Sequence, residues 1–216
     1  MSDVNGWNRD LYVYHLLRGG EYTGSWNADW IAQLRMDWDG VPILIRGDLE
    51  RTGKYTDQIR VRVIVPLELE KYYKLTVSKR SMVNVGLNLL QKEDFGCPEL
   101  SRERRIRTNE EAFTAQALQD AAWKESLTGC PDCALEVRPV LPGQGGEHTL
   151  MVSITENDLT GFGALPISYQ DDPEKLQQMF RDGETKELED SLTVRNLDAA
   201  VELAKRTVRA LRLWRM

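Results

Sequence analysis

The chain has 216 residues with 34 acidic and 28 basic side chains, which gives a formal net charge of -6 at pH 7. This balance opposes general attraction to nucleic-acid phosphates and to anionic lipid, so we expect no nucleic-acid partner. An apolar fraction of 41%, a charged fraction of 29% and six tryptophans indicate a folded chain and exclude a disordered one. At this length we expect a single domain over residues 1–216.

Targeting signals are not recognisable in the sequence. No apolar run approaches the roughly 18 residues of a membrane span. The N-terminus, MSDVNGWNRDLYVYHLL, lacks the basic segment, apolar stretch and small-residue cleavage site of a secretory signal. Three cysteines are an odd number that does not form a secreted disulfide framework. We therefore expect a cytoplasmic protein.

Residues about 7–80 predict a helix followed by a β-meander. Trp7, Leu11 and Tyr14 share one helical face, and the Gly19-Gly20 pair would end the helix; a strand through LYVYHLL is the alternative. From Trp30 the apolar residues alternate with a period of two. The sequence therefore changes from a helical to a strand pattern at this point.

A hairpin is predicted next, because Asp39-Gly40 supplies the residues that a tight turn needs at positive φ. In the return strand Val41, Ile43, Ile45 and Leu49 share one face, and Pro42 indicates that the strand begins at a sheet edge. Two further alternating segments, at 59–65 and 73–77, complete a meander of four successive strands.

The outward positions of this meander carry basic residues that could form a stripe, namely Arg35, Arg46, Arg60, Arg62 and Lys74. Such a stripe could bind an anion. Long cationic side chains also simply solvate an exposed sheet face, and this is the interpretation that we favour.

A central helix is predicted over about 108–128. Thr108 and Glu111 have the spacing of a capping box, the apolar residues from Phe113 onward form one face, and Gly129 would end the helix. A second hairpin, over about 134–155, follows. The segment 160–168 resembles a loop or short edge strand with an accessible backbone.

The C-terminal helices are predicted over about 172–214. Asp172 would cap the first of them and Asn196 the last, which is long and amphipathic. The last helix is basic towards its C-terminus, so contact with a membrane surface is an alternative to docking on a sheet. Strands, a helix, a hairpin and further helices in this order predict an α+β fold: an antiparallel meander and a second hairpin packed with a central and a long C-terminal helix.

The most specific motif is Cys130-Pro131-Asp132-Cys133. A CxxC pair exchanges disulfides when a helix N-terminus acidifies its first thiol. Here the pair follows a predicted helix, whose C-terminal carbonyls would raise the pKa of the first thiol, so redox catalysis is disfavoured. The alternative is a zinc site formed by Cys97, Cys130 and Cys133 with His148 or a carboxylate as fourth ligand. Packed thiols or a local turn, without metal or other cofactor, are the interpretation that we favour.

Catalytic motifs are otherwise missing. The sequence contains no G-x-S-x-G, H-E-x-x-H or P-loop pattern, and the glycines between 143 and 146 join two strands rather than open a helix. His15 and His148 are better explained as helix and hairpin residues than as catalytic bases. Catalytic residues are therefore unknown, and an enzyme is the less favoured class.

The segment GCPELSRERRIRTNEEAFTAQAL, after the strand KLTVSKRS, resembles an uncharacterised bacterial α+β domain family. The family pattern is Gly-Asp-Pro-x-Phe-Asp, then a short strand and a helix. Gly96 and Pro98 match it, Cys97 stands where an acid is common, and Leu100-Ser101 replace Phe-Asp. Members are often membrane associated through separate spans. The resemblance implies an interaction module and no catalytic residues.

These observations favour a non-enzymatic protein-interaction or structural module that binds a protein partner or itself, through an exposed sheet face or the C-terminal helix. Two alternatives stay open. One is a small-ligand-binding protein or enzyme with a pocket between sheet and helices, and the other is a metal-stabilised module that uses the three cysteines.

Overall fold

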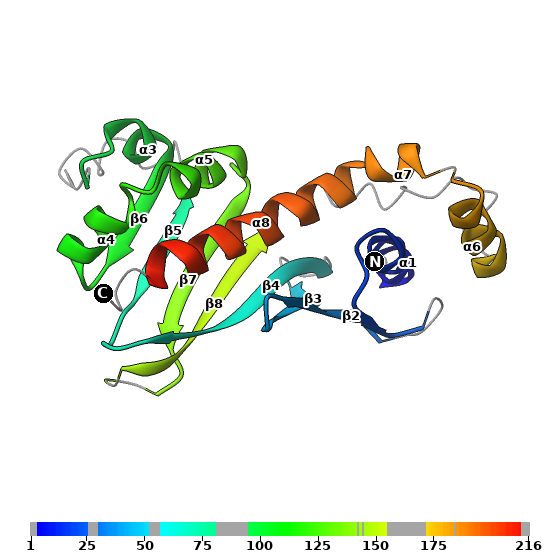
Figure 1. Cartoon of the computed structure of the whole chain (residues 1–216), viewed down its shortest axis with the longest axis horizontal. Coiled ribbons are helices and arrows are strands. Elements are labelled where there is room, and N and C mark those ends of the chain that lie inside the picture. The colour runs from blue at the N-terminus through cyan, green and yellow to red at the C-terminus, as the bar shows by residue number, and fades with distance from the viewer. Residues whose placement is uncertain are drawn as a thin grey trace. The chain divides into compact units, whose positions relative to one another are not determined.

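The computed structural model describes residues 4–25, 30–51, 57–80, 95–141, 143, 145–154, 172–183 and 185–212. Within these residues the fold is α+β, as predicted, and contains an antiparallel eight-stranded sheet with the order β1-β2-β3-β4-β8-β7-β5-β6 (Figure 1). The chain divides into two compact units. Unit 1 comprises 1–63 and 154–198, and unit 2 comprises 64–153 and 199–216.

Unit 1 begins with the predicted N-terminal helix, α1 (Val4–Arg18). Trp7, Leu11 and Tyr14 are buried on one face, and the indole Nε1 of Trp7 donates a hydrogen bond to the Ala32 carbonyl at 3.2 Å. Gly19 ends the helix with a φ of 77°, and its amide donates to His15 O. The glycine signal therefore marked the helix end correctly.

The strands of unit 1 are β1 (Glu21–Thr23), β2 (Gln33–Trp38), β3 (Val41–Arg51) and the first part of β4 (Asp57–Leu69). Strands β2 and β3 form the predicted hairpin, in which Trp38 pairs with Val41 across Asp39-Gly40, and both turn residues have positive φ. Pro42 does not mark a sheet edge, because β3 lies between β2 and β4. It is tolerated as the second residue after the turn, and Leu49, expected on the inward face, is exposed.

The helices of unit 1 include α6 (Pro173–Arg181), α7 (Lys186–Glu189) and the start of α8 (Leu192–Arg212). Asp172 caps α6 as predicted, since its carboxylate accepts a hydrogen bond from Lys175 N at 3.1 Å. Helix α8 begins four residues before the predicted cap Asn196, and Ser191 Oγ accepts from Val194 N at 3.3 Å instead. A hydroxyl that reaches the first free amides serves as well as an amide side chain.

Unit 2 contains the rest of β4 and α8. Its other elements are β5 (Leu75–Lys79), α3 (Pro98–Glu103), β6 (Arg104–Thr108), α4 (Glu111–Ala117), α5 (Ala121–Gly129), β7 (Cys133–Pro139) and β8 (Gly146–Ile154). Strands β7 and β8 are the predicted second hairpin. Strand β5 leaves the meander and pairs antiparallel with β6 and β7, which corrects the prediction of four successive neighbouring strands.

The predicted central helix is two helices and a strand. Thr108 belongs to β6 and pairs with Leu75, so it is not a helix cap. Asp120 breaks the helical run because its carboxylate accepts a hydrogen bond from Trp123 N at 2.8 Å and starts α5 there. Trp123 is fully buried, and its Nε1 donates to Thr207 Oγ1 on α8. The apolar face of α8 is buried as predicted, from Leu197 to Leu211.

Two of the sequence interpretations lie outside the described residues. They are the segment 81–94, which the sequence left between strand and loop, and the segment 160–168, which it assigned to a loop or edge strand.

Candidate functional site

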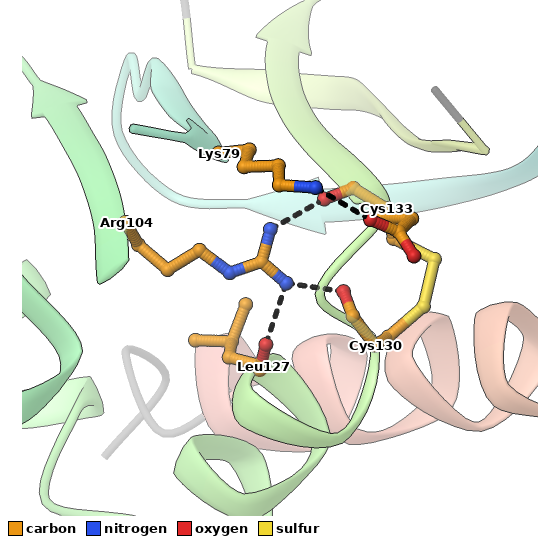
Figure 2. The surroundings of a disulfide bond; sticks show 6 residues. Lys79, Arg104, Leu127, Cys130 and Cys133 are labelled. Carbon is orange, nitrogen blue, oxygen red and sulfur yellow. Dashed lines mark hydrogen bonds and ion pairs between the residues drawn. A yellow bond between two sulfur atoms is a disulfide. The ribbon is translucent and has the colours of Figure 1, made fainter. Parts of the chain in front are cut away.

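The CxxC motif lies between α5 and β7, which confirms the predicted order of helix, cysteine pair and strand. Cys130 is the residue that follows α5, Pro131 and Asp132 form a turn, and Cys133 begins β7. A disulfide joins the two cysteines, whose Cα atoms are 5.5 Å apart (Figure 2). The amide of Cys133 also donates a hydrogen bond to the Cys130 carbonyl at 3.1 Å. The turn is therefore closed by a covalent bond and by a backbone hydrogen bond.

Cys97 is a free, buried cysteine in a different setting. It immediately precedes α3, and its thiol donates to the Leu118 carbonyl, with an Sγ to O distance of 3.7 Å. The structure thus joins two of the three predicted metal ligands to each other and gives the third a backbone partner. Among the described residues no group of three or more His, Cys, Asp or Glu side chains is placed to hold a metal ion. A zinc site at Cys97, Cys130 and Cys133 stays a prediction, which the metal content of the reduced protein would test.

Arg104 completes the site. It is the first residue of β6, only 3% of its surface is exposed, and its guanidinium spans the end of α5 and the start of β7. It donates to the carbonyl oxygens of Leu127 at 2.6 Å and Cys133 at 2.8 Å, and also to that of Cys130 (Figure 2). The last turn of a helix leaves carbonyls without intrahelical partners, and a fork of five N–H donors suits several of them at once.

The dipoles of the three backbone carbonyls that Arg104 binds compensate its positive charge. Burial lowers the pKa of Arg104 from its ordinary value, and the negative charges of Asp132 and Glu103 partly oppose that shift. Within the described part of the chain the guanidinium forms no ion pair with a carboxylate. The Asp132 carboxylate instead accepts from Lys79 Nζ at 2.9 Å, at the exposed rim of the loop (Figure 2). Among the described residues the guanidinium thus contacts the backbone of both disulfide cysteines and no carboxylate.

Arg104 was not among the residues predicted to matter. It stands in the charged run RERRIRT, just before the predicted central helix and within the segment that resembles the bacterial family. The available signal was period-two alternation: Arg104 and Ile106 are buried, whereas Arg105 and Arg107 lie on the other face of β6. An arginine at an inward strand position requires polar partners in the interior.

The two histidines serve structural roles. His148 is 1% exposed, its Nε2 accepts a hydrogen bond from the Tyr73 amide at 3.2 Å, and its Nδ1 lies 2.8 Å from Gly146 O. Both nitrogens thus have backbone partners, which leaves neither for a metal. His15 on α1 packs beside the rings of Tyr12 and Tyr22. The interpretation of both as helix and hairpin residues agrees with these positions.

A chain of hydroxyl groups lies next to His148 in unit 2. Tyr73 Oη is 2.8 Å from Thr114 Oγ1, which donates to Thr108 Oγ1 at 2.9 Å. Burial is the main cause that raises the pKa of Tyr73 to about 12, and the hydrogen bonds of Thr114 and Thr108 act against it. Tyr73 is therefore held as a neutral phenol in the core.

The predicted basic stripe is largely paired with carboxylates. Arg62 contacts Asp48 at 2.7 Å and Glu50 at 2.8 Å. Arg60 contacts Glu50 at 2.9 Å, and Arg46 contacts Asp48 at 3.3 Å. We name these five residues of β3 and β4 the β3–β4 ion-pair network. Its acids cancel most of the charge that an anion would need, in agreement with the favoured interpretation of a solvated sheet face.

A shallow polar depression lies on β1, β2 and β3 rather than between sheet and helices. Its lining residues are Glu21, Thr23, Gln33, Arg35 and Leu44. Glu21 and Arg35 are paired positions of β1 and β2. The depression therefore offers one acid and one base on an open sheet face, without the buried polar groups that position a substrate.

Strand β6 is the last strand in the sheet order, and its hydrogen-bonding pattern defines which groups face outward. Arg80 N donates to Glu103 O at 3.0 Å and Asn109 N to Lys74 O at 3.3 Å, so residues 103, 105, 107 and 109 form the hydrogen-bonded pairs with β5. Because such pairs alternate in an antiparallel ladder, the backbone groups of Arg104, Ile106 and Thr108 point away from β5. The Arg104 amide donates to the Leu100 carbonyl at the end of α3, so Ile106 and Thr108 carry the outward amides of the strand. No described strand pairs with this side of β6.

None of the helices among the described residues combines the length with the apolar composition that a bilayer crossing requires.

No protein-family model and no curated protein matches this sequence. Among solved structures, the crystal structure of the mycobacterial trehalose monomycolate transport factor A, TtfA, is similar to this chain with a TM-score of 0.47 and 10% sequence identity, over 96% of each chain. At that score and identity the likeness assigns neither a fold family nor a function to this chain.

Proposed function

We propose that the chain is a non-enzymatic protein-interaction module that binds an extended, acidic segment of a partner protein along the outer side of β6. The observation that carries this proposal is the position of β6 at the end of the sheet, where the amides of Ile106 and Thr108 point away from β5. An extended segment that joins such an edge forms main-chain hydrogen bonds for affinity and uses side chains for specificity.

The charge of β6 selects an acidic partner. The strand reads Arg-Arg-Ile-Arg-Thr, and it carries three positive charges in a chain whose net charge is -6. Arg107 is exposed, and Arg102 just before the strand is exposed as well. A segment with Asp or Glu at alternate positions would place its carboxylates on the same face as Arg107. Electrostatic complementarity of this kind raises the association rate and specifies the partner.

The two surfaces that the sequence favoured support an interaction less well. The arginines of the outward sheet face belong to the β3–β4 ion-pair network, so they offer little charge to a partner. The apolar face of α8 is buried from Leu197 to Leu211. By comparison, among the residues that the structure describes no strand pairs with the outer side of β6, and no carboxylate forms an ion pair with the exposed Arg107. The sequence suggests a bacterial protein located in the cytoplasm, and both points stay predictions.

The test uses the full chain and a synthetic ten-residue peptide of alternating Glu and Val, labelled for fluorescence anisotropy. We expect saturable binding, and in amide hydrogen-exchange NMR we expect added protection of Ile106 and Thr108. The Arg104 amide, which already donates to Leu100 O, should change little. Arg107→Glu should weaken the affinity by about tenfold, the size of a lost charge contact plus a new repulsion.

Arg138→Glu is the matched control, because Arg138 is an exposed arginine on β7, an inner strand of the same unit. It should leave the affinity within about twofold. A peptide N-methylated at alternate amides should not bind, since it lacks the donors of a strand. Equal affinity of the methylated peptide, or binding without protection of the Ile106 and Thr108 amides, would refute the edge-strand proposal.

A further inference from the structure

We propose that Cys130 and Cys133 form a reversible thiol–disulfide exchange site for dithiols and disulfides, in which Arg104 stabilises the thiolate that forms when the bond opens. This site is independent of peptide binding at β6. It revises the sequence argument against redox chemistry, which depended on free carbonyls at the end of the helix before the motif.

The structure removes the basis of that argument. The carbonyls that would disfavour a thiolate at Cys130 belong to the last turn of α5, and the guanidinium of Arg104 binds two groups at this end, Leu127 O and Cys130 O. The negative end of the helix dipole is therefore covered by a full positive charge. A cation next to a cysteine lowers its pKa and increases the thiolate fraction at neutral pH.

Arg104 is also placed to respond to that negative charge. Its guanidinium binds the carbonyls of both cysteines, so it lies against the two residues whose sulfurs would carry the charge (Figure 2). It is buried and has only neutral carbonyls in contact with it. A thiolate would supply the opposite charge that a buried guanidinium otherwise lacks.

The turn is held without the disulfide, which makes the bond reversible rather than structural. Three contacts persist when the sulfurs separate: Cys133 N to Cys130 O, and Arg104 to the carbonyls of Cys130 and Cys133. The Cα atoms, 5.5 Å apart, stay within the range that a disulfide requires. Because only two residues lie between the cysteines, the bond removes little chain entropy from the unfolded state.

Access to the pair is limited and selective. Cys130 is 6% exposed and Cys133 is 4% exposed, but Pro131 between them is exposed and the Lys79 and Asp132 ion pair lies at the rim. Small dithiols, or a narrow loop of a larger dithiol protein, fit this approach. Cys97 is not a third participant, because its thiol is buried against the Leu118 carbonyl.

The exchange is balanced by the reagent. A thiolate of an external dithiol attacks one sulfur of the Cys130–Cys133 bond, a mixed disulfide forms, and the other cysteine leaves as a thiolate beside Arg104. The second thiol of the reagent then displaces the protein sulfur and leaves the reagent as a disulfide. In total two electrons pass from the reagent to the protein cysteines, which become two thiols once protonated.

The test treats the folded full chain with dithiothreitol in mixtures of its reduced and oxidised forms. Iodoacetamide then traps free thiols, and mass spectrometry of peptides locates them. We expect reversible labelling of Cys130 and Cys133, with no labelling of Cys97 before denaturant is added. The labelling rate of the first cysteine to react should have its pH midpoint below the ordinary cysteine value of about 8.5.

Two surface variants test the charge dependence without altering the buried Arg104. Asp132→Asn removes a negative charge at the rim and should raise the labelling rate at pH 7 about two- to threefold. Lys79→Gln removes a positive charge there and should lower the rate by a similar factor. Resistance of the folded protein to dithiothreitol would overturn the proposal. A pH midpoint at or above that of free cysteine would overturn it as well, and so would a lower rate for Asp132→Asn with a higher rate for Lys79→Gln.

Discussion

Two groups of arginines show how the same side chain serves different purposes in the two units. In unit 1, Arg46, Arg60 and Arg62 are partly exposed and contact the carboxylates of Asp48 and Glu50. In unit 2, Arg104 is buried and contacts three backbone carbonyls. The first group carries charge that water also stabilises. The second replaces water at a helix end, where its donors reach carbonyls that lack intrahelical partners.

The two groups differ in the free-energy cost of removing the arginine, because its partners are different. An exposed carboxylate without its arginine is hydrated, so the net cost is small. Buried carbonyls without a donor keep their full desolvation penalty. The free energy of unfolding should therefore depend strongly on Arg104 and weakly on the β3–β4 ion-pair network, although that network contains more ion pairs. The three predictions below test this contrast.

The largest effect is expected for Arg104→Met, which keeps an unbranched side chain and removes all donors. The interior carbonyls of Leu127 and Cys133 lose the Arg104 donor, and that of Cys130 keeps only the Cys133 amide, so the free energy of unfolding should fall by about 3 to 5 kcal/mol. Urea denaturation followed by tryptophan fluorescence measures this loss. Arg107→Met is the control on the same strand, and it should change stability by less than about 0.5 kcal/mol. Similar losses in both variants would show that burial does not distinguish these arginines.

The second prediction concerns a buried group of unit 2 that stays neutral. The pKa of Tyr73 is raised to about 12 in the folded chain, so the unfolded chain releases this proton first as pH increases. The stability contribution is complete below pH of about 10 and is lost as pH rises towards 12, with a slope of about 1.4 kcal/mol per pH unit. Tyr73→Phe should lose roughly 1 kcal/mol at pH 7, with its hydrogen bond to Thr114, and should show a shallower alkaline slope.

Urea denaturation at intervals between pH 8 and 11.5 gives both quantities for Tyr73→Phe. Other tyrosines also contribute to the loss of folding stability at high pH, since burial is the first cause of the raised pKa of Tyr22 as well. Tyr22→Phe therefore serves as a comparison in unit 1. An alkaline slope unchanged by Tyr73→Phe would contradict the assignment of a neutral, buried phenol.

The smallest effect is expected for Arg62→Ala in the β3–β4 ion-pair network. Its loss breaks the contacts with Asp48 and Glu50, whose side chains keep exposures of 27% and 30% and are rehydrated. We expect a loss of about 0.5 to 1 kcal/mol, reduced further in 1 M salt. Thermal unfolding at low and high salt measures it. A loss as large as that of Arg104→Met would remove the contrast between the two groups.

Prediction from sequence succeeded where a residue type acts locally. Asp39-Gly40 produced its hairpin, Gly19 ended α1, and Asp172 capped α6, because each depends on backbone geometry within a few residues. It failed where two local signals competed. Thr108 has the chemistry of a cap but pairs in β6, and Asp120 splits a run that would otherwise continue as one helix.

The candidate site was predicted only in part. The order of helix, cysteine pair and strand was derived correctly, and it identified the end of α5 as the place to consider. The partner of that helix end could not be derived, because Arg104 lies 26 residues before Cys130 and reaches it through strand pairing. Periodicity shows which face a residue occupies but not which distant carbonyls it meets.

By itself the sequence determined the α+β class, the two hairpins, the buried faces of α1 and α8, and the position of the CxxC motif between a helix and a strand; the disulfide between Cys130 and Cys133 came from the structure. These follow from short-range periodicity, turn chemistry and a spacing of three residues. Only the tertiary structure decided that β5 leaves the meander, that β6 forms a sheet edge, that Cys97 stands apart, and that Arg104 covers the end of α5. Those features depend on pairings between residues far apart in the chain, for which many arrangements satisfy the same local pattern.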